Sequence, residues 1–251
     1  MKKTALVLAM LAAAGFSSAQ AQNYQMEAEV GYTDTDLNDD SIFDASFVYH
    51  LAPVATAGLP LAEAAFLTYS SNFGIGYATF DDADVDTIGV QGEVYFDKVY
   101  IRAGYSSTGG DDLFADVDTI SGRIGYVVLP GLRLAAGVNR VDVDAPGVEE
   151  SNDIVIEGKY VTKLAGDTAV NLEAALTMLD EADDEVIEIS GDYYFNHALS
   201  VGAGASFADD DDNYGVNARY FFTPKFSGQL QYVTVNDGDD DSIRVSAALR
   251  F

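Results

Sequence analysis

The chain ends on DSIRVSAALRF, residues 241–251, in which apolar and polar residues alternate without interruption. One face carries Ile243, Val245, Ala247, Leu249 and Phe251, and the other carries Ser242, Arg244, Ser246, Ala248 and Arg250. A period of two indicates a β-strand whose faces meet different surroundings. A last strand that is apolar on one face and charged on the other, and that ends on Phe, is typical of a transmembrane β-barrel. A soluble sandwich also buries one strand face, so this segment alone leaves both folds open.

The first 21 residues have the features of a secretory signal peptide. Lys2 and Lys3 form a basic start, residues 5–16 form an apolar stretch, and Ala19-Gln20-Ala21 forms a cleavage site with small residues. No later apolar run approaches the ~20 residues that a membrane helix needs. We therefore expect a signal peptide over residues 1–21 and one domain over residues 22–251, which can span a membrane only as a barrel.

The composition excludes several classes of function. The formal net charge is −28, there are no cysteines, and there are two histidines. Nucleic acid is excluded as a partner because phosphate neutralisation needs clustered Lys and Arg. Disulfides, thiolate chemistry and cysteine-type zinc sites are excluded as well.

The placement of the acidic residues predicts the topology. Seven clusters hold 30 of the 41 acidic residues, at 34–40, 81–86, 111–118, 142–153, 180–185, 209–212 and 237–241. Two strand-like stretches separate successive clusters, with short breaks at 97–98, 129–131, 165–167, 196–197 and 223–225 and a longer one at 51–62. Long loops at one rim and short turns at the other are typical of up-and-down barrels. We predict an all-β fold, a transmembrane antiparallel up-and-down β-barrel of about 14 strands.

Most strands have one face fit for lipid and one that collects the remaining charges. Residues 88–96, for example, place Ile88, Val90 and Val94 on one face and Glu93 on the other. In a barrel of fourteen strands, which is too wide for side chains to fill, the charged face lines a wet lumen. The predicted pore-lining residues are Glu27, Glu29, Glu93, Arg102, Arg123, Arg133, Glu157, Lys159, Glu173, Glu188, Asp192, Arg219, Arg244 and Arg250.

Aromatic residues gather near the predicted strand ends, as in the interfacial belts of membrane barrels. The belt at the short-turn rim is predicted to include Tyr49, Tyr95, Phe96, Tyr100, Tyr126, Tyr194, Phe195, Phe221, Phe222, Phe226 and Phe251. The belt at the acidic rim is predicted to include Tyr32, Phe80, Tyr105, Phe207 and Tyr214.

Candidate catalytic and metal motifs are weak. Asp34-x-Asp36-x-Asn38 starts like a calcium-binding loop but lacks the glycine and the bidentate glutamate that such a loop needs. A barrel enzyme needs a nucleophile beside a base, and His50 and His197 both fall near the short-turn rim rather than the outer face. We expect no enzymatic activity and no dedicated metal site, only diffuse binding of Ca²⁺ or Mg²⁺ by the acidic loops.

The segment GLPLAEAAFLTYSSNFGIGY (58–77), an acidic first loop, the strand IGVQGEVYF (88–96) and the terminal Arg-Phe pair resemble the small outer-membrane porins of Gram-negative bacteria, which form monomeric fourteen-stranded barrels. The resemblance implies a passive channel for small solutes in the cell outer membrane, with no cofactor and no catalytic residues.

Three hypotheses for function remain open. The first is a porin for small hydrophilic solutes and ions, with selectivity set by the pore-lining residues. The second is a closed structural or interaction barrel whose acidic loops bind divalent cations, lipopolysaccharide or a partner. The third is a secreted soluble binding protein. The expected partners are outer-membrane lipid and lipopolysaccharide, the permeating solutes and ions, and the barrel-assembly machinery through the strand that ends on Phe251.

The segment LAPVATAGLPLAEAAF (51–66) differs from the other short-rim turns because it is long, apolar and rich in Ala. Residues 61–67 are predicted to form a short helix that begins after Pro60. An apolar segment has little reason to extend into water, so folding back across the barrel mouth would bury it. We predict that it narrows the pore; packing on the outer wall or under the rim is the alternative.

Overall fold

The computed structural model describes residues 23–36, 40–81, 83–110, 115–180, 184–209, 212–235 and 240–251. The predicted signal peptide lies outside these residues, as do parts of six of the seven acidic clusters. Among the described residues, no helix has the length and hydrophobicity that crossing a membrane requires.

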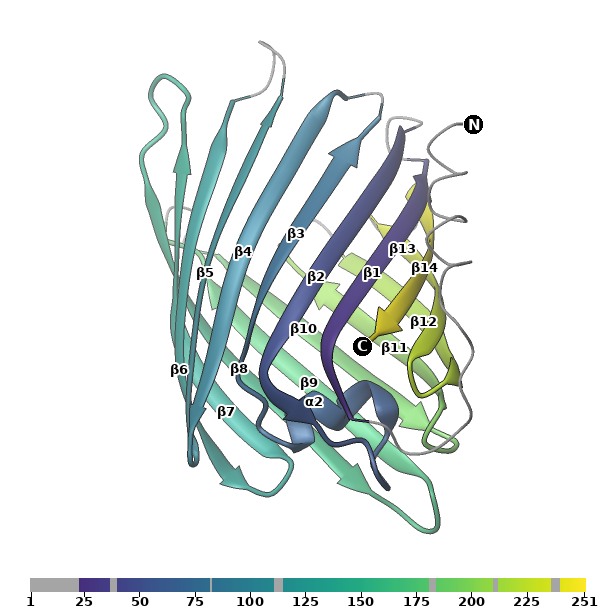
Figure 1. The fold of residues 1–251 in the computed structure, drawn as a ribbon. Coiled ribbons are helices and arrows are strands. Elements are labelled where there is room, and N and C mark those ends of the chain that lie inside the picture. The colour runs from purple at the N-terminus through teal and green to yellow at the C-terminus, as the bar shows by residue number, and fades with distance from the viewer. Residues whose placement is uncertain are drawn as a thin grey trace.

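The described residues form fourteen antiparallel strands closed into a barrel, as predicted (Figure 1). Each strand pairs with its neighbours along the chain, and β1 pairs with β14 from Glu27↔Arg250 to Thr35↔Ser242. The strands are β1 (Tyr24–Thr35), β2 (Asp40–Val54), β3 (Asn72–Phe80), β4 (Val85–Phe96), β5 (Val99–Gly110), β6 (Val117–Leu129), β7 (Leu132–Val143), β8 (Ser151–Lys163), β9 (Ala169–Met178), β10 (Glu185–Tyr194), β11 (Leu199–Phe207), β12 (Asp212–Thr223), β13 (Phe226–Val235) and β14 (Asp240–Arg250).

The short breaks in the sequence form tight turns. These turns lie at the same rim as the start of β1 and the end of β14. Asp97 and Gly131 adopt positive φ angles of 55° and 82° in two of these turns. A β-carbon on Gly131 would lie 2.1 Å from the carbonyl oxygen of Val161, so this turn requires glycine. The predicted turns at this rim are therefore confirmed.

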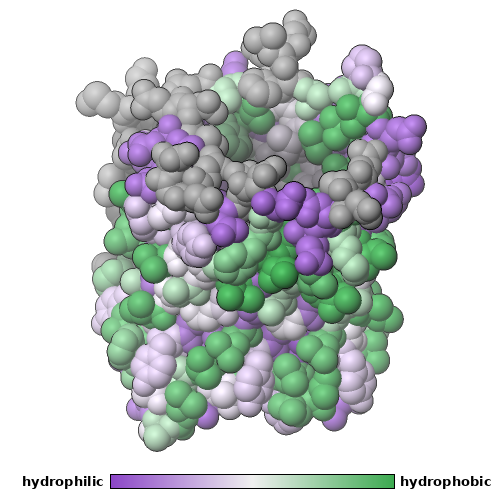
Figure 2. All heavy atoms as spheres, turned by 180° about the vertical axis from the view of Figure 1, so that it is seen from behind, coloured by the Kyte–Doolittle hydropathy of each residue, from purple (hydrophilic) through white to green (hydrophobic). Residues whose placement is uncertain are grey.

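The outer face of the barrel is apolar, as the alternation predicts. Ile124 is 64% exposed and Phe96 is 63% exposed, which places both on the outside. On the face that Figure 2 shows, apolar and weakly polar side chains cover most of the lower part, and strongly polar ones gather nearer the acidic rim. This surface matches a membrane barrel, in which lipid covers the outward face of each strand.

Two details differ from the sequence-based expectation. Strand β2 continues to Val54, although the break was expected to start at residue 51. Its pairing with β1 shifts register between Tyr24↔Val54 and Met26↔Tyr49, and Pro53 lies in this irregular stretch, where no ladder hydrogen bond is needed from its nitrogen.

The second difference concerns the aromatic belt at the short-turn rim. Four of its expected members point into the barrel instead, because each is an odd number of residues from a lipid-facing neighbour: Tyr95, Tyr100, Tyr194 and Phe221. Tyr100 and Tyr194 are 0% and 2% exposed. The belt prediction was wrong for these residues because nearness to a strand end does not determine which face a side chain occupies.

Candidate functional site in the barrel interior

A segment between β2 and β3 folds into the barrel at the short-turn rim. We call residues 55–71 the inward loop; it contains the 3₁₀ turn η2 (Leu61–Glu63) and the helix α2 (Ala64–Leu67). Figure 1 shows α2 inside the lower end of the barrel. The turn begins after Pro60, whose φ of −55° suits the start of a helix. The predicted helix over residues 61–67 is therefore confirmed.

Apolar packing fixes this loop against the barrel wall. Ala64 is fully buried against Tyr24 and Val54, and the half-buried Leu59 and Ala65 pack on the same cluster. Burial of this apolar surface is the main reason for the loop to turn inward rather than extend into water.

Hydrogen bonds tie the loop to distant strands. The Leu61 amide donates to the His197 carbonyl, 2.8 Å away in the turn between β10 and β11. The Leu61 carbonyl accepts a hydrogen bond of 2.9 Å from Arg250 Nη1 on β14. Lys163 at the end of β8 donates to the Gly58 carbonyl. These contacts come from different sides of the barrel, so the loop crosses its mouth.

Glu63 connects the inward loop to the barrel wall through its charged side chain. Its side chain is 7% exposed, Tyr194 on β10 donates a hydrogen bond to it at 2.7 Å, and the Lys159 ammonium on β8 lies 2.9 Å from it. Lys159 also lies 2.8 Å from Glu173 on β9. A buried carboxylate requires such partners, because an unpaired buried charge is strongly destabilising. We call Glu63, Lys159, Glu173 and Tyr194 the lysine bridge.

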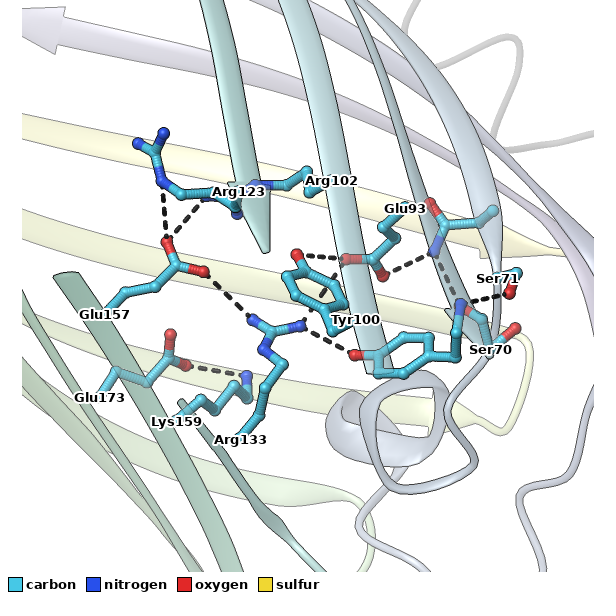
Figure 3. Close-up of polar contacts among 12 residues, drawn as sticks. Ser70, Ser71, Glu93, Tyr100, Arg102, Arg123, Arg133, Glu157, Lys159 and Glu173 are labelled. Atoms are coloured by element: carbon cyan, nitrogen blue, oxygen red, sulfur yellow. Dashed lines mark hydrogen bonds and ion pairs between the residues drawn. The ribbon is translucent and has the colours of Figure 1, made fainter. Parts of the chain in front are cut away.

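Three arginines of the inner wall converge on two carboxylates (Figure 3). Glu157 on β8 lies 2.8 Å from Arg102, 3.6 Å from Arg123 and 3.7 Å from Arg133. Glu93 on β4 lies 3.8 Å from Arg133. We call these five residues the arginine cluster; its three positive and two negative charges leave one positive charge in excess.

Members of the arginine cluster differ in how open they are to the lumen. Arg123 is 8% exposed and donates to the carbonyls of Gly122 and Val138 and to the Asn139 side chain, so it lies against the wall. The Arg102 side chain is 29% exposed and reaches Glu157 through Nη2.

Aromatic rings join the arginine cluster to the inward loop. The Arg133 guanidinium lies 3.9 Å from the centre of the Tyr100 ring and 5.4 Å from that of Phe66 in α2. Tyr69 of the loop packs on Tyr95, with the ring centres 5.6 Å apart. Cation–π contacts of desolvated arginines stabilise such layers. The loop and the inner wall therefore form one packed layer.

Other predicted pore-lining residues are also paired. Arg244 on β14 lies 3.0 Å from Glu29 and 2.7 Å from Asp44. Arg250 is paired with Glu27 and is 5% exposed. Arg219 donates to Gln229 on the neighbouring strand.

Above the inward loop lies a cavity of about 580 Å³. Its lining includes side chains of both signs: Arg102, Arg133, Lys159, Glu157, Glu173, Glu188 and Asp192. Asn171 is 2% exposed and donates from Nδ2 to Glu173 at 2.8 Å and to Asp192 at 3.3 Å. Glu188 is exposed and has no hydrogen-bond or ion-pair partner among the described residues.

Sequence reasoning missed Glu63, Tyr194, Tyr100 and Asn171. A signal for Glu63 was present, because it is the one charged residue in segment 51–66. Tyr100 and Tyr194 were assigned to the wrong face. Within the part of the chain that the structure describes, no group of three His, Cys, Asp or Glu side chains is placed to hold a metal ion.

Comparisons with known proteins agree with this architecture. A family model described as "Putative general bacterial porin" matches residues 1–144 and 140–251. The crystal structure of the Acinetobacter baumannii outer membrane protein Omp33 superposes with a TM-score of 0.76 at 28% identity, covering 92% of this chain and 100% of that one. The KdgM porin superposes with a TM-score of 0.50 at 10% identity, covering 90% and 99%. A mutant of the Rh. blastica porin gives 0.50 at 12% identity, covering 92% and 100%. The search of curated proteins gave no match.

Proposed function

Because this chain belongs to the general bacterial porin family, we propose that it is a passive outer-membrane channel for small hydrophilic solutes and ions, and that the inward loop limits flow through it. The observation that supports this most is the charged cavity of about 580 Å³ inside a barrel with an apolar outer face. A barrel with a purely structural role would not need a polar interior that is open to solvent.

The inward loop restricts the flow of solutes through the proposed channel. It contacts β8, β10 and β14 across the mouth and buries Ala64 and Glu63. Since a packed layer of side chains leaves little room for solutes, conduction through the native chain requires the loop to move or water to pass beside it. The proposed channel is therefore narrow or gated at the short-turn rim.

The partners proposed for this function follow from its setting. Lipid and lipopolysaccharide would contact the outer face and the acidic rim, with diffuse divalent cations between them. The strand that ends on Phe251 would present the assembly signal to the barrel-assembly machinery. The proposed role is transport by diffusion, without a cofactor or a catalytic step.

Single-channel recording in planar bilayers tests the proposal. His50 and Asn72 are direct partners in the β2–β3 ladder, so residues 51–71 can be replaced by Asn-Gly, which makes a two-residue hairpin. We expect small or rare openings for the native chain and conductance several times larger for this trimmed variant. A change in gel mobility on heating confirms that the barrel has folded.

The closed-barrel alternative predicts a different outcome. If the trimmed variant folds, inserts into bilayers and still carries no current, the lumen is not a solute path. The acidic loops would then be the functional part, and the charged cavity would be a by-product of closing fourteen strands.

A further inference from the structure

In the cavity of about 580 Å³, which we call the central cavity, charges of opposite sign come from different strands. Its basic side chains come from β5, β7 and β8, and its acidic side chains other than Glu157 come from β9 and β10. Small residues, chiefly glycine and alanine, make up most of the remaining lining, and five polar side chains lie among them: Ser190, Ser206, Asn213, Asn217 and Gln231. Such a lining suits a polar solute that has distinct positive and negative ends.

Arg102 is the group on the basic side that a solute can reach. Its partners in the cluster, Arg123 and Arg133, have side chains only 6% and 11% exposed, whereas that of Arg102 is 29% exposed. Among the described residues, the hydrogen bond of Arg102 comes from Nη2, so its other guanidinium donors are available. With one positive charge in excess, the arginine cluster favours an added carboxylate.

The acidic side has the opposite excess. Glu173 shares Lys159 with Glu63, so this group of three side chains has a net charge of −1. Asp192 receives a hydrogen bond only from the neutral Asn171, and Glu188 has no partner among the described residues. This wall therefore favours an added cation.

The spacing of these carboxylates favours an organic cation over a bare metal ion. Glu188 and Asp192 are four residues apart on one strand, which separates their backbones by about 13 Å. No three acidic or imidazole groups in the described ranges are placed to hold a metal ion. An ammonium group has three donors in different directions and can use carboxylate and amide oxygens without such close coordination.

From this arrangement we propose that the cavity binds a solute of the size of an amino acid or dipeptide, with its carboxylate at Arg102 and its ammonium group at the wall formed by Glu188 and Asp192. The volume of about 580 Å³ is within the usual range for small-ligand sites. This inference rests on the proposed channel function and names the class of solute for which the channel is built.

Equilibrium dialysis with the full barrel purified in detergent tests the site without requiring ion flow. The probes are 3-aminopropanoate, 4-aminobutanoate and 6-aminohexanoate, compared with propylamine and propanoate, which each carry one of the two charged groups. At low salt we expect at least one amino acid to bind at least tenfold more tightly than either half. The preferred chain length reports the distance between the two subsites.

Variants with matched controls assign the two ends. Arg102→Gln and the double variant Glu188→Gln with Asp192→Asn should each weaken the preferred amino acid at least tenfold. Glu185→Gln removes one carboxylate charge on the opposite face of β10, and Arg140→Gln removes an outward arginine that is paired with Glu150. Both controls should bind like the native chain. All variants must show the native heat-dependent gel mobility.

Three results would overturn the inference. Equal binding of propylamine and the amino acids, with no effect of Arg102→Gln, would show a cation site only. Equal binding of propanoate and the amino acids, with no effect of the double variant, would show an anion site only. Absence of binding at millimolar concentrations would show no site. If the trimmed variant conducts while binding is absent, only this inference fails; if binding is present while the trimmed variant does not conduct, the proposed channel function fails.

Discussion

Charged side chains beside the inward loop differ from those in the central cavity in their burial and in their partners. Beside the loop, Glu63 is buried and bound by both Lys159 and Tyr194. In the cavity, Glu188 is exposed and has no partner among the described residues, and Arg102 keeps an open side chain. The same residue types therefore have two roles. Buried and paired charges hold the loop in place, whereas under the proposed function the more exposed charges of the cavity would act on a passing solute.

The largest expected effect comes from breaking the lysine bridge. Lys159→Met removes the ammonium group and leaves Glu63 buried without its cation, which costs about 3–5 kcal/mol for buried pairs. Because that cost falls on the seated loop, we expect the open probability in single-channel records to rise at least tenfold. Adding Glu63→Gln removes the unpaired charge and should restore part of the closed state. An unchanged open probability in Lys159→Met would show that the bridge does not hold the loop.

The next effect concerns the seam between β1 and β14. Arg250→Ala removes the ion pair with Glu27, the hydrogen bond to the Leu61 carbonyl and the contacts of the guanidinium with Tyr24 and Phe221. We expect the barrel to lose its heat-resistant gel mobility at a temperature several degrees lower than the native chain, because Glu27 and the Leu61 carbonyl are left without their partner and the guanidinium no longer packs on the two rings.

Arg140→Ala is the matched control for the seam variant. Arg140 pairs with Glu150, but both side chains are about half exposed, at 53% and 44%. Exposed ion pairs contribute little to stability, so this variant should unfold close to the native temperature. Equal losses in the two variants would mean that Arg250 contributes no more than a surface arginine does.

The strand arrangement was accessible from the sequence for a physical reason. Lipid on one side and polar space on the other impose a period of two on every strand, and residues 88–96 or 241–251 show it directly. The same period could have placed Tyr100 and Tyr194 inside, had it been given more weight than their nearness to a turn. The short helix after Pro60 followed from local rules alone.

The pairing of the inward charges was not accessible from the sequence. Periodicity places Arg102, Arg123 and Arg133 on the inner face but does not show that all three reach Glu157, which is on β8. Such contacts depend on strand register and tilt, which shift residues of distant strands relative to one another. The same limit applies to Glu63, whose partners are 96 and 131 positions away along the chain. That the fourteen inward residues line the solute path stays a prediction.

The smallest expected effect is a difference in ion selectivity between variants of the more exposed Arg102 and of the buried Arg123. In the trimmed variant, Arg102→Ser should make the channel more cation-selective, because an exposed positive charge is removed from the path. The change in the permeability ratio should be below about tenfold, since a unit charge about 4 Å from an ion in water contributes about 1 kcal/mol. Arg123→Ser should change selectivity less, because Arg123 lies against the wall and bonds to the Val138 carbonyl.

Reversal potentials in a salt gradient measure this difference, first at low salt and then at high salt. The Debye length falls from about 30 Å at 0.01 M to about 3 Å at 1 M, so the shift caused by Arg102→Ser should shrink as salt rises. Arg140→Ser, which changes an outward charge, should show no shift. If Arg102→Ser and Arg123→Ser shift the reversal potential equally, both guanidinium groups face the ion path, and the contrast between open and wall-bound charges is wrong for this pair.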